Sequence, residues 1–204
     1  MDEYIPITVV YEDLVSLSVI QRSLELFGNK FTISQELSAG GFGYIRKRIR
    51  NFNRAARNLP FLVVTDLDDK PCPVALIAEW FPEPMSDNMI FRIAVREVES
   101  WLLADRAGFA EFLGIAQNIV PFRPDEVTDP KAELLILTRK CRRREVREDI
   151  LPRDWAVIKQ GPNYNGRLLE YVANTWDPTR AREASPSFDR MLNALDRFSF
   201  SYAP

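Results

Sequence analysis

The chain has 204 residues, 46% of them hydrophobic, so it is long enough to fill one ordinary core and does not require a second. Its 27 basic and 29 acidic residues nearly balance, so a nucleic-acid site has to come from local clustering of basic residues. It contains no histidine, which excludes histidine zinc sites, imidazole-activated nucleophiles and imidazole acid/base catalysis. A hydrolytic enzyme with this composition must therefore use carboxylates, lysine or a metal ion.

No apolar stretch is long enough to span a bilayer, and residues 1–4 have neither the basic nor the apolar region of a secretory signal. Cys72 and Cys141 are not spaced as a metal site, and two thiols make no disulfide framework. We therefore expect a cytoplasmic protein that does not enter a membrane.

The first predicted elements alternate between strand and helix. A β-branched run over residues 7–11 predicts a strand that ends in two acids, Glu12 and Asp13. Apolar residues at helical spacing predict a helix over 17–27, and alternating apolar residues over 31–37 predict a half-buried or edge strand.

A basic helix is predicted next, over residues 45–57, with an apolar face and an arginine face. Arg46, Arg50 and Arg54 recur every four residues and repel one another by a few tenths of a kcal/mol per pair, a cost that a bound phosphate chain would reverse. The alternative is an ordinary solvated face. The Gly-Gly-Phe-Gly at 40–43 lacks the spacing and lysine of a phosphate-binding loop, so it is a weak nucleotide signature.

Residues 61–69 form an unbroken apolar run that ends in three carboxylates within four positions. Such a run is typical of a strand inside a parallel sheet, whose ligands bind beyond the carboxyl ends of the strands. On an extended segment, Asp66 and Asp68 would face one point while Leu67 faces the core. Two such carboxylates repel, and a divalent cation is the simplest compensation. The alternative is that Asp68 and Asp69 only open a turn.

The second half of the chain is predicted to be mainly helical. A second basic cluster, within 139–147, is interleaved with acids and is better interpreted as a solvated face. In chain order the predicted elements are a strand at 89–95, a helix at 96–104 with Glu97 and Glu99 in its first turn, a helix capped by Asp105, a helix from Asp129-Pro130 to about Arg143, a short strand at 156–158, a helix at 167–173 and a last helix capped by Ser185-Pro186.

The order of elements predicts an α/β fold, with a parallel-rich sheet flanked by helices and a helical C-terminal elaboration. Glu12, Asp66, Asp68 and Glu99 each follow a strand or begin a helix, so we expect them at one edge of the sheet. Hard cations prefer oxygen ligands, and this set would hold one or two Mg²⁺ or Mn²⁺ ions. Glu99 also has a simpler explanation, because a first-turn carboxylate is favoured by the helix dipole.

The chain resembles a Toprim domain, the Mg²⁺-binding fold of topoisomerases, bacterial primases and OLD-family nucleases. The Toprim glutamate and Asp-x-Asp motifs match Glu12 and Asp66-Leu67-Asp68, although Asp13 stands where Toprim domains commonly have glycine. Further segments resemble the landmarks of an uncharacterised bacterial Toprim-like family: Arg96–Asp105, Asp129–Lys131, Gly161–Tyr164 and Ala184–Phe188.

The resemblance implies one Toprim-like domain over residues 1–204, with an α/β metal-site core at 1–105 and a mainly helical elaboration at 106–204. It also implies a place in a bacterial defence or DNA-processing system. We therefore expect a Mg²⁺-dependent nuclease that hydrolyses phosphodiesters, with catalysis and metal binding by the four carboxylates.

In this hypothesis Arg46, Arg50 and Arg54 bind the nucleic acid, DNA or RNA, and Lys131 or Lys159 stabilises the developing charge. A partner ATPase would license cleavage. The main alternative is a non-catalytic Toprim-like module that binds nucleic acid or a partner ATPase. A phosphorelay receiver also carries acids after its first and third strands, but it would leave the basic helices and the last hundred residues unexplained.

Overall fold

The computed structural model describes residues 4–38, 42–153 and 160–200. These residues form two compact units, and the chain passes from the first to the second between Val95 and Arg96. It returns to the first unit at Arg190, within the last helix. No helix of the described ranges has the length and apolar character needed to cross a membrane.

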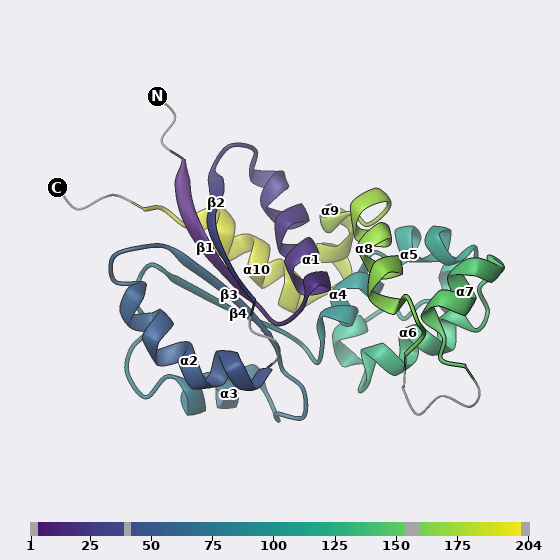
Figure 1. Cartoon of the computed structure of the whole chain (residues 1–204), viewed down its shortest axis with the longest axis horizontal. Coiled ribbons are helices and arrows are strands. Elements are labelled where there is room, and N and C mark those ends of the chain that lie inside the picture. Colours follow the sequence, from purple (N-terminus) through teal and green to yellow (C-terminus); the bar gives the residue numbers. More distant parts are fainter. Residues whose placement is uncertain (1–3, 39–41, 154–159, 201–204) are drawn as a thin grey trace. The chain divides into compact units, whose positions relative to one another are not determined.

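The first unit contains a four-stranded, fully parallel sheet in the order β2-β1-β3-β4 (Figure 1). The predicted parallel sheet is therefore confirmed. The strand that ends at Asp66 lies inside the sheet, as expected, and the half-buried second strand lies at an edge. The strands are β1 (Ile5–Tyr11), β2 (Phe31–Ser38), β3 (Phe61–Asp66) and β4 (Met89–Ala94).

Helices cover both faces of this sheet. Right-handed crossovers between parallel strands place α1 (Leu14–Leu24, followed by a short 3-10 turn at Glu25–Phe27) on one face. They place α2 (Phe42–Ala55) and α3 (Pro73–Trp80) on the other, and the last helix, α10 (Pro186–Arg197), lies on the α1 face (Figure 1). The predicted inward face of α2 is buried against β3 and β4, through Ile45, Ile49, Phe52 and Ala56.

Sequence patterns missed α3, because its region is rich in proline. Pro73 stands at the first helical position, where a missing N–H costs nothing, and Cys72 Sγ caps the helix by accepting from Ala75 N. Leu76 and Trp80 of this helix then pack into the core of the first unit. Proline at this position therefore begins a helix.

The second unit is helical. The helix predicted from Asp129 to about Arg143 ends at Thr138, and the chain turns through a buried Cys141 before the next helix begins. The strand predicted at 156–158 lies outside the described residues. The helices are α4 (Val98–Ala104), α5 (Arg106–Leu113), α6 (Pro130–Thr138), α7 (Arg144–Ile150), α8 (Tyr164–Asn174) and α9 (Pro178–Ala184), with 3-10 turns at Gln117–Ile119 and Pro124–Glu126.

The boundary between the units falls at Val95 and not near residue 105, where the metal-site core was expected to end. The reason is that α4 packs within the second unit. The indole of Trp101 is fully buried and donates to Ser187 Oγ at 2.7 Å, and Trp176 Nε1 donates to the Trp101 carbonyl at 3.0 Å.

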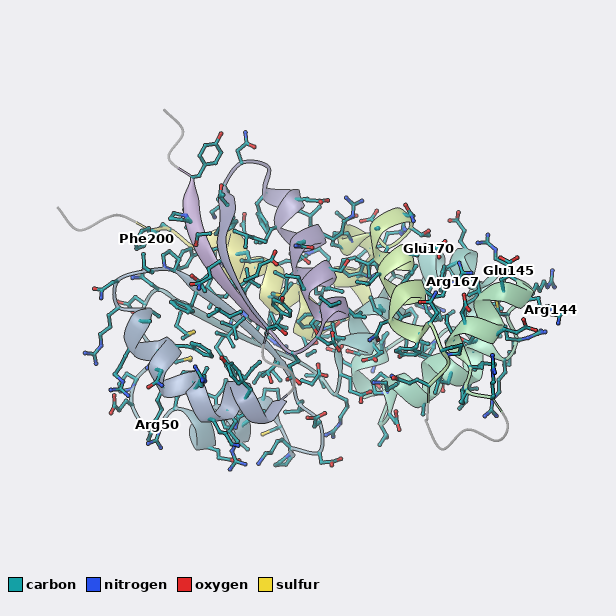
Figure 2. All side chains as sticks on the ribbon, viewed as in Figure 1. Arg50, Arg144, Glu145, Arg167, Glu170 and Phe200 are labelled. Atoms are coloured by element: carbon teal, nitrogen blue, oxygen red, sulfur yellow. The ribbon has the colours of Figure 1, made fainter. Side chains whose placement is uncertain are left out.

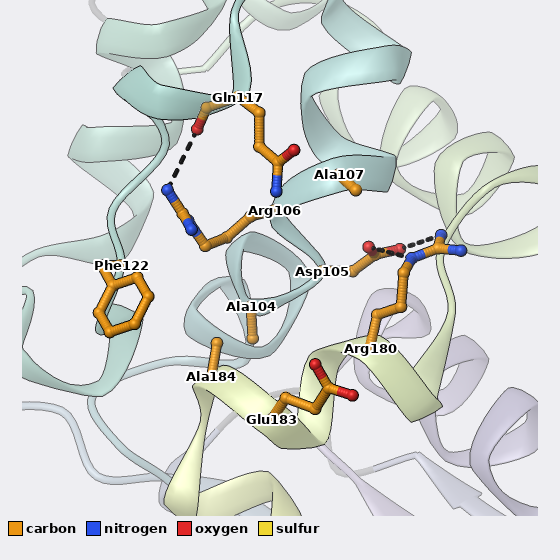
Figure 3. A pocket seen from close by; sticks show the side chains of 9 residues that line it. All are labelled: Ala104, Asp105, Arg106, Ala107, Gln117, Phe122, Arg180, Glu183 and Ala184. Carbon is orange, nitrogen blue, oxygen red and sulfur yellow. Dashed lines mark hydrogen bonds and ion pairs between the residues drawn. The ribbon is translucent and has the colours of Figure 1, made fainter.

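Asp105 is the best-buried charge of the second unit, with 0% of its surface exposed. Its carboxylate accepts from Gly108 N, so it caps α5 as predicted, and it accepts from Asp177 N at 2.8 Å. Arg180 donates to both carboxylate oxygens at 2.7 Å (Figure 3). A bidentate pair of this kind satisfies the buried charge and joins α4, α5 and α9.

Replacing Arg180 with alanine should therefore destabilise the protein by about 3 kcal/mol, because it leaves a buried carboxylate without its counter-charge. Arg182→Ala is the matched control. Both arginines are on α9 and similarly exposed, but Arg182 pairs with Asp189, which is 37% exposed, so its loss should cost less than about 1 kcal/mol. Urea unfolding measures the free energy of unfolding of the two variants. An equal loss of stability in both would contradict a structural role for Asp105.

Candidate functional site

Glu12 follows β1 directly and reaches across to the end of β3. Its Oε1 atom accepts hydrogen bonds from Thr65 Oγ1 at 2.5 Å and from Asp66 N at 2.9 Å. Within the described part of the chain, both of these bonds go to Oε1, which leaves Oε2 as a ligand atom for another group. The structure thus places the Glu12 carboxylate on the backbone amide of Asp66, and convergence of the two carboxylates stays a prediction.

Asp13, the second acid after β1, has a structural role. Its Oδ1 accepts from Ser16 N at 2.8 Å and from Ser16 Oγ at 3.0 Å, which caps α1. Its backbone is extended, with φ at −144°, so no glycine is needed there. The carboxylate of Asp13 is therefore occupied with the helix start.

Asp66 and Asp68 flank a buried Leu67, but the reason is not the alternation of an extended strand. β3 ends at Asp66, and Asp68 has a positive φ of 49°, in the left-handed region. Lys70 N donates to the Leu67 carbonyl at 3.1 Å, which closes a turn. Asp68 therefore lies in a turn, and its charge also acts on Glu12. Asp tolerates this backbone region better than most residues, so the cost is modest.

The electrostatics of Glu12 show that these acids share one environment. Burial raises the pKa of its carboxyl above the usual value, and the charges of Asp68 and Asp13 raise it further. The hydrogen bonds from Thr65 and Asp66 oppose this rise. Glu12 therefore carries its negative charge at a cost, which a nearby cation would remove.

The described residues contain no group of three or more His, Cys, Asp or Glu side chains already placed to hold a metal ion. Glu12, Asp66 and Asp68 lie at the ends of two adjacent strands, but their carboxyl groups do not form a closed cage. All three offer oxygen atoms, and this donor type suits Mg²⁺ or Mn²⁺ and does not suit softer metals.

Glu99, the fourth predicted ligand, lies in the second unit with a different set of partners. It is 5% exposed, accepts from the Tyr164 hydroxyl at 3.0 Å, and lies 3.5 Å from Lys131 Nζ. Lys131, one of the two predicted charge-stabilising residues, thus neutralises a buried glutamate. Lys159, the other, lies outside the described residues.

Glu97 is the functional candidate that sequence reasoning missed. It lies just before the first turn in which it was expected, as the N-cap residue of α4, and its Oε2 accepts from Lys131 N at 3.1 Å. Burial raises the pKa of its carboxyl to about 7, helped by the charges of Glu99 and Asp129 and opposed by Lys131. The available signal was two glutamates, two residues apart, at the start of a short apolar helix.

The predicted nucleic-acid residues lie on the outer side of α2 in the first unit. Arg46, Arg50 and Arg54 are exposed, and Arg50 points away from the helix (Figure 2). Arg46 pairs with Glu79 at 2.8 Å and Arg54 donates to Asn51, whereas Arg50 forms no ion pair with any described residue. Arg50 and Arg54 also line a pocket of about 220 Å³ beside α3.

Several basic residues of the second unit form ion pairs. Arg144 binds Glu148, and Arg167 lies between Glu145 and Glu170 (Figure 2). A pocket of about 240 Å³ in this unit is lined by Arg106, Phe122 and the Asp105–Arg180 pair (Figure 3). The buried carboxylate of this pocket, Asp105, is already satisfied by its hydrogen bonds and its ion pair.

The pKa of Glu97 gives a pH prediction. Between about pH 4.5 and 7 the folded protein holds a proton that the unfolded chain has lost, so the free energy of unfolding should fall as pH rises through this window. Glu97→Gln should remove this dependence and stabilise the protein at pH 8 by on the order of 1 to 2 kcal/mol, less than the full shift implies because the group is half-exposed.

Urea unfolding at several pH values tests this prediction, with Glu111→Gln, an exposed glutamate of α5, as the control. An unchanged pH dependence in Glu97→Gln would show that Glu97 ionises normally.

A comparison with curated proteins and a comparison with solved structures each found no match to the chain. A family model described as "Domain of unknown function (DUF4276)" matches residues 14–196, which include Asp66, Asp68, Glu97, Glu99 and both basic helices. The chain belongs to this DUF4276 family.

Proposed function

We propose that this chain is a metal-dependent phosphodiesterase that acts on nucleic acid. The observation that carries the proposal is the placement of Glu12, whose carboxylate is fixed on the backbone amide of Asp66 within range of the Asp68 charge. These acids lie at the carboxyl ends of two adjacent parallel strands, where α/β sheets bind their ligands.

Glu12, Asp66 and Asp68 would hold Mg²⁺ or Mn²⁺. Glu12 suits this role because its Oε1 is fixed by two hydrogen bonds while Oε2 is available, so the side chain is oriented before a cation arrives. When bound, the metal would stabilise the negative charge that develops on the phosphodiester oxygens. Glu99 as a further ligand remains a prediction.

The arginine face of α2 would bind the phosphate backbone. Arg50 forms no ion pair with a described residue, and together with Arg54 and Glu83 it lines a pocket in the same unit as the carboxylates. Contacts between arginine and phosphate carry no base information, so binding should weaken with salt and show little sequence preference. The resemblance of Glu12 and Asp66-Leu67-Asp68 to the Toprim motif also supports the proposal of a metal-dependent phosphodiesterase.

Cleavage of DNA and RNA, single- and double-stranded, with Mg²⁺ or Mn²⁺ is the direct test. Asp66→Asn should abolish cleavage without unfolding the protein. Asp69→Asn is the matched control, because Asp69 is an exposed acid of the same turn outside the motif, and it should retain activity. Activity in Asp66→Asn would exclude the proposed site.

Metal binding can be tested separately from cleavage. In EDTA, Asp66→Asn with Asp68→Asn should melt at the same temperature as the wild type or higher, because two repelling charges are removed and Asn also tolerates the backbone of Asp68. Excess Mn²⁺ should raise the melting temperature of the wild type only, through selective binding to the folded state. A clear loss of stability in EDTA would mean that the pair is structural.

The non-catalytic alternative, a module that binds nucleic acid or a partner ATPase, is supported by the absence of a preformed carboxylate cage in the described ranges. It predicts no cleavage with any metal, but binding that survives Asp66→Asn and falls with Arg50→Glu. Arg144→Glu, which makes the same charge change in the second unit, is the control.

A further inference from the structure

A pocket of about 530 Å³ in the first unit is lined by three arginines. Arg92 comes from β4, and Arg190 and Arg197 come from the part of α10 that belongs to this unit. The volume lies within the range of small-molecule sites, roughly 300 to 1,000 Å³.

Arg92 is a partly buried cation that forms no ion pair with any described residue. Its Nη1 donates to the Phe91 carbonyl at 2.7 Å, but its Nε is buried and has no hydrogen-bond partner among the described residues. Burial lowers the pKa of this guanidinium, and the charge of Arg190 lowers it further. Buried charges are normally paired, so this one indicates a missing anion.

Arg190 and Arg197 add two more positive charges to the lining of this pocket. They are seven residues apart on α10 and therefore lie on one side of the helix. Neither forms an ion pair with a carboxylate of the described ranges, and Asp87, which also lines the pocket, pairs with none of the three arginines. Cations gathered in this way repel one another, and an anion between them would reverse that cost.

We propose that this pocket binds the phosphate group of a nucleotide, either a free nucleotide or one residue of a nucleic-acid strand. The planar guanidinium matches phosphate oxygens in pairs, and three guanidiniums suit a phosphate better than a single carboxylate. The pocket is larger than one phosphate. Phe198 supplies an apolar wall, and the Asp87 carboxylate can accept from a sugar hydroxyl or a base amino group.

This pocket is separate from the candidate catalytic edge. β4 contributes Met89, Ile90 and Arg92 to the pocket, whereas Asp66 pairs with Ala94, the last residue of the strand. None of the candidate metal ligands lines the pocket. The inference therefore does not rest on the proposed phosphodiesterase activity.

The test is calorimetric titration of the full chain in EDTA at low salt, so that metal binding plays no part. The probes are inorganic phosphate, ADP, adenosine and a short single-stranded DNA. Arg190→Gln with Arg197→Gln leaves Arg92 and its backbone contact intact. The control is Arg22→Gln with Arg57→Gln, two exposed arginines of the same unit, which makes the same change in net charge. Thermal melts verify that each variant is folded.

ADP should bind the wild type and the control alike, and should bind the Arg190/Arg197 variant about tenfold or more weakly, whereas adenosine should not bind. If ADP fails to bind but the DNA binds with the same dependence on Arg190 and Arg197, the phosphate comes from a nucleic-acid strand. The proposal is overturned if no phosphate-bearing probe binds, or if the two double variants bind every probe equally.

Discussion

The hydrogen bond from the Asp66 amide to the Glu12 carboxylate is the contact on which the candidate site depends. It joins the ends of β1 and β3, which are neighbours only because the chain crosses from β2 back over the sheet. With the bond from Thr65, it holds a glutamate at the edge of the sheet in a position that raises the energy of its charged form. A carboxylate that is fixed but poorly compensated is suited to receive a cation and contributes little to stability as it stands.

The charged groups of the protein fall into two kinds. Asp105 is fully buried, yet it has two backbone donors and a bidentate arginine, so its charge is neutralised within the fold. Glu12 and Arg92 are partly removed from water, but the charge of Glu12 is opposed by other acids and that of Arg92 by another arginine. Because an uncompensated charge costs free energy, its persistence suggests a ligand of opposite sign, whereas a compensated one needs no further explanation.

Much of the first unit follows from sequence pattern. β-branched runs located β1 and β3, helical spacing located α2, and the acids after each strand located Glu12 and Asp66. The sequence patterns failed where the local sequence indicated a different structure from the one that the folded protein adopts. The helices α3 and α9 were not predicted because each begins with proline, which the first turn of a helix tolerates. The positive φ of Asp68 was not predicted because no sequence pattern in an Asp-rich turn indicates it. Glu97 and the arginine pocket escaped because their environment comes from residues distant in the sequence, such as Lys131 and Arg190.

The return of α10 to the first unit has a consequence for synthesis. Met191, Leu192 and Leu195 are buried in the part of this helix that belongs to the sheet-containing unit, although the rest of that unit ends at Val95. At about 5 to 20 residues per second, the ribosome needs on the order of 5 to 20 s to make the segment between them. During this time the sheet lacks its last helix, while the whole second unit emerges. Chaperones that protect exposed apolar surface would act on this protein during that interval, before translation reaches α10.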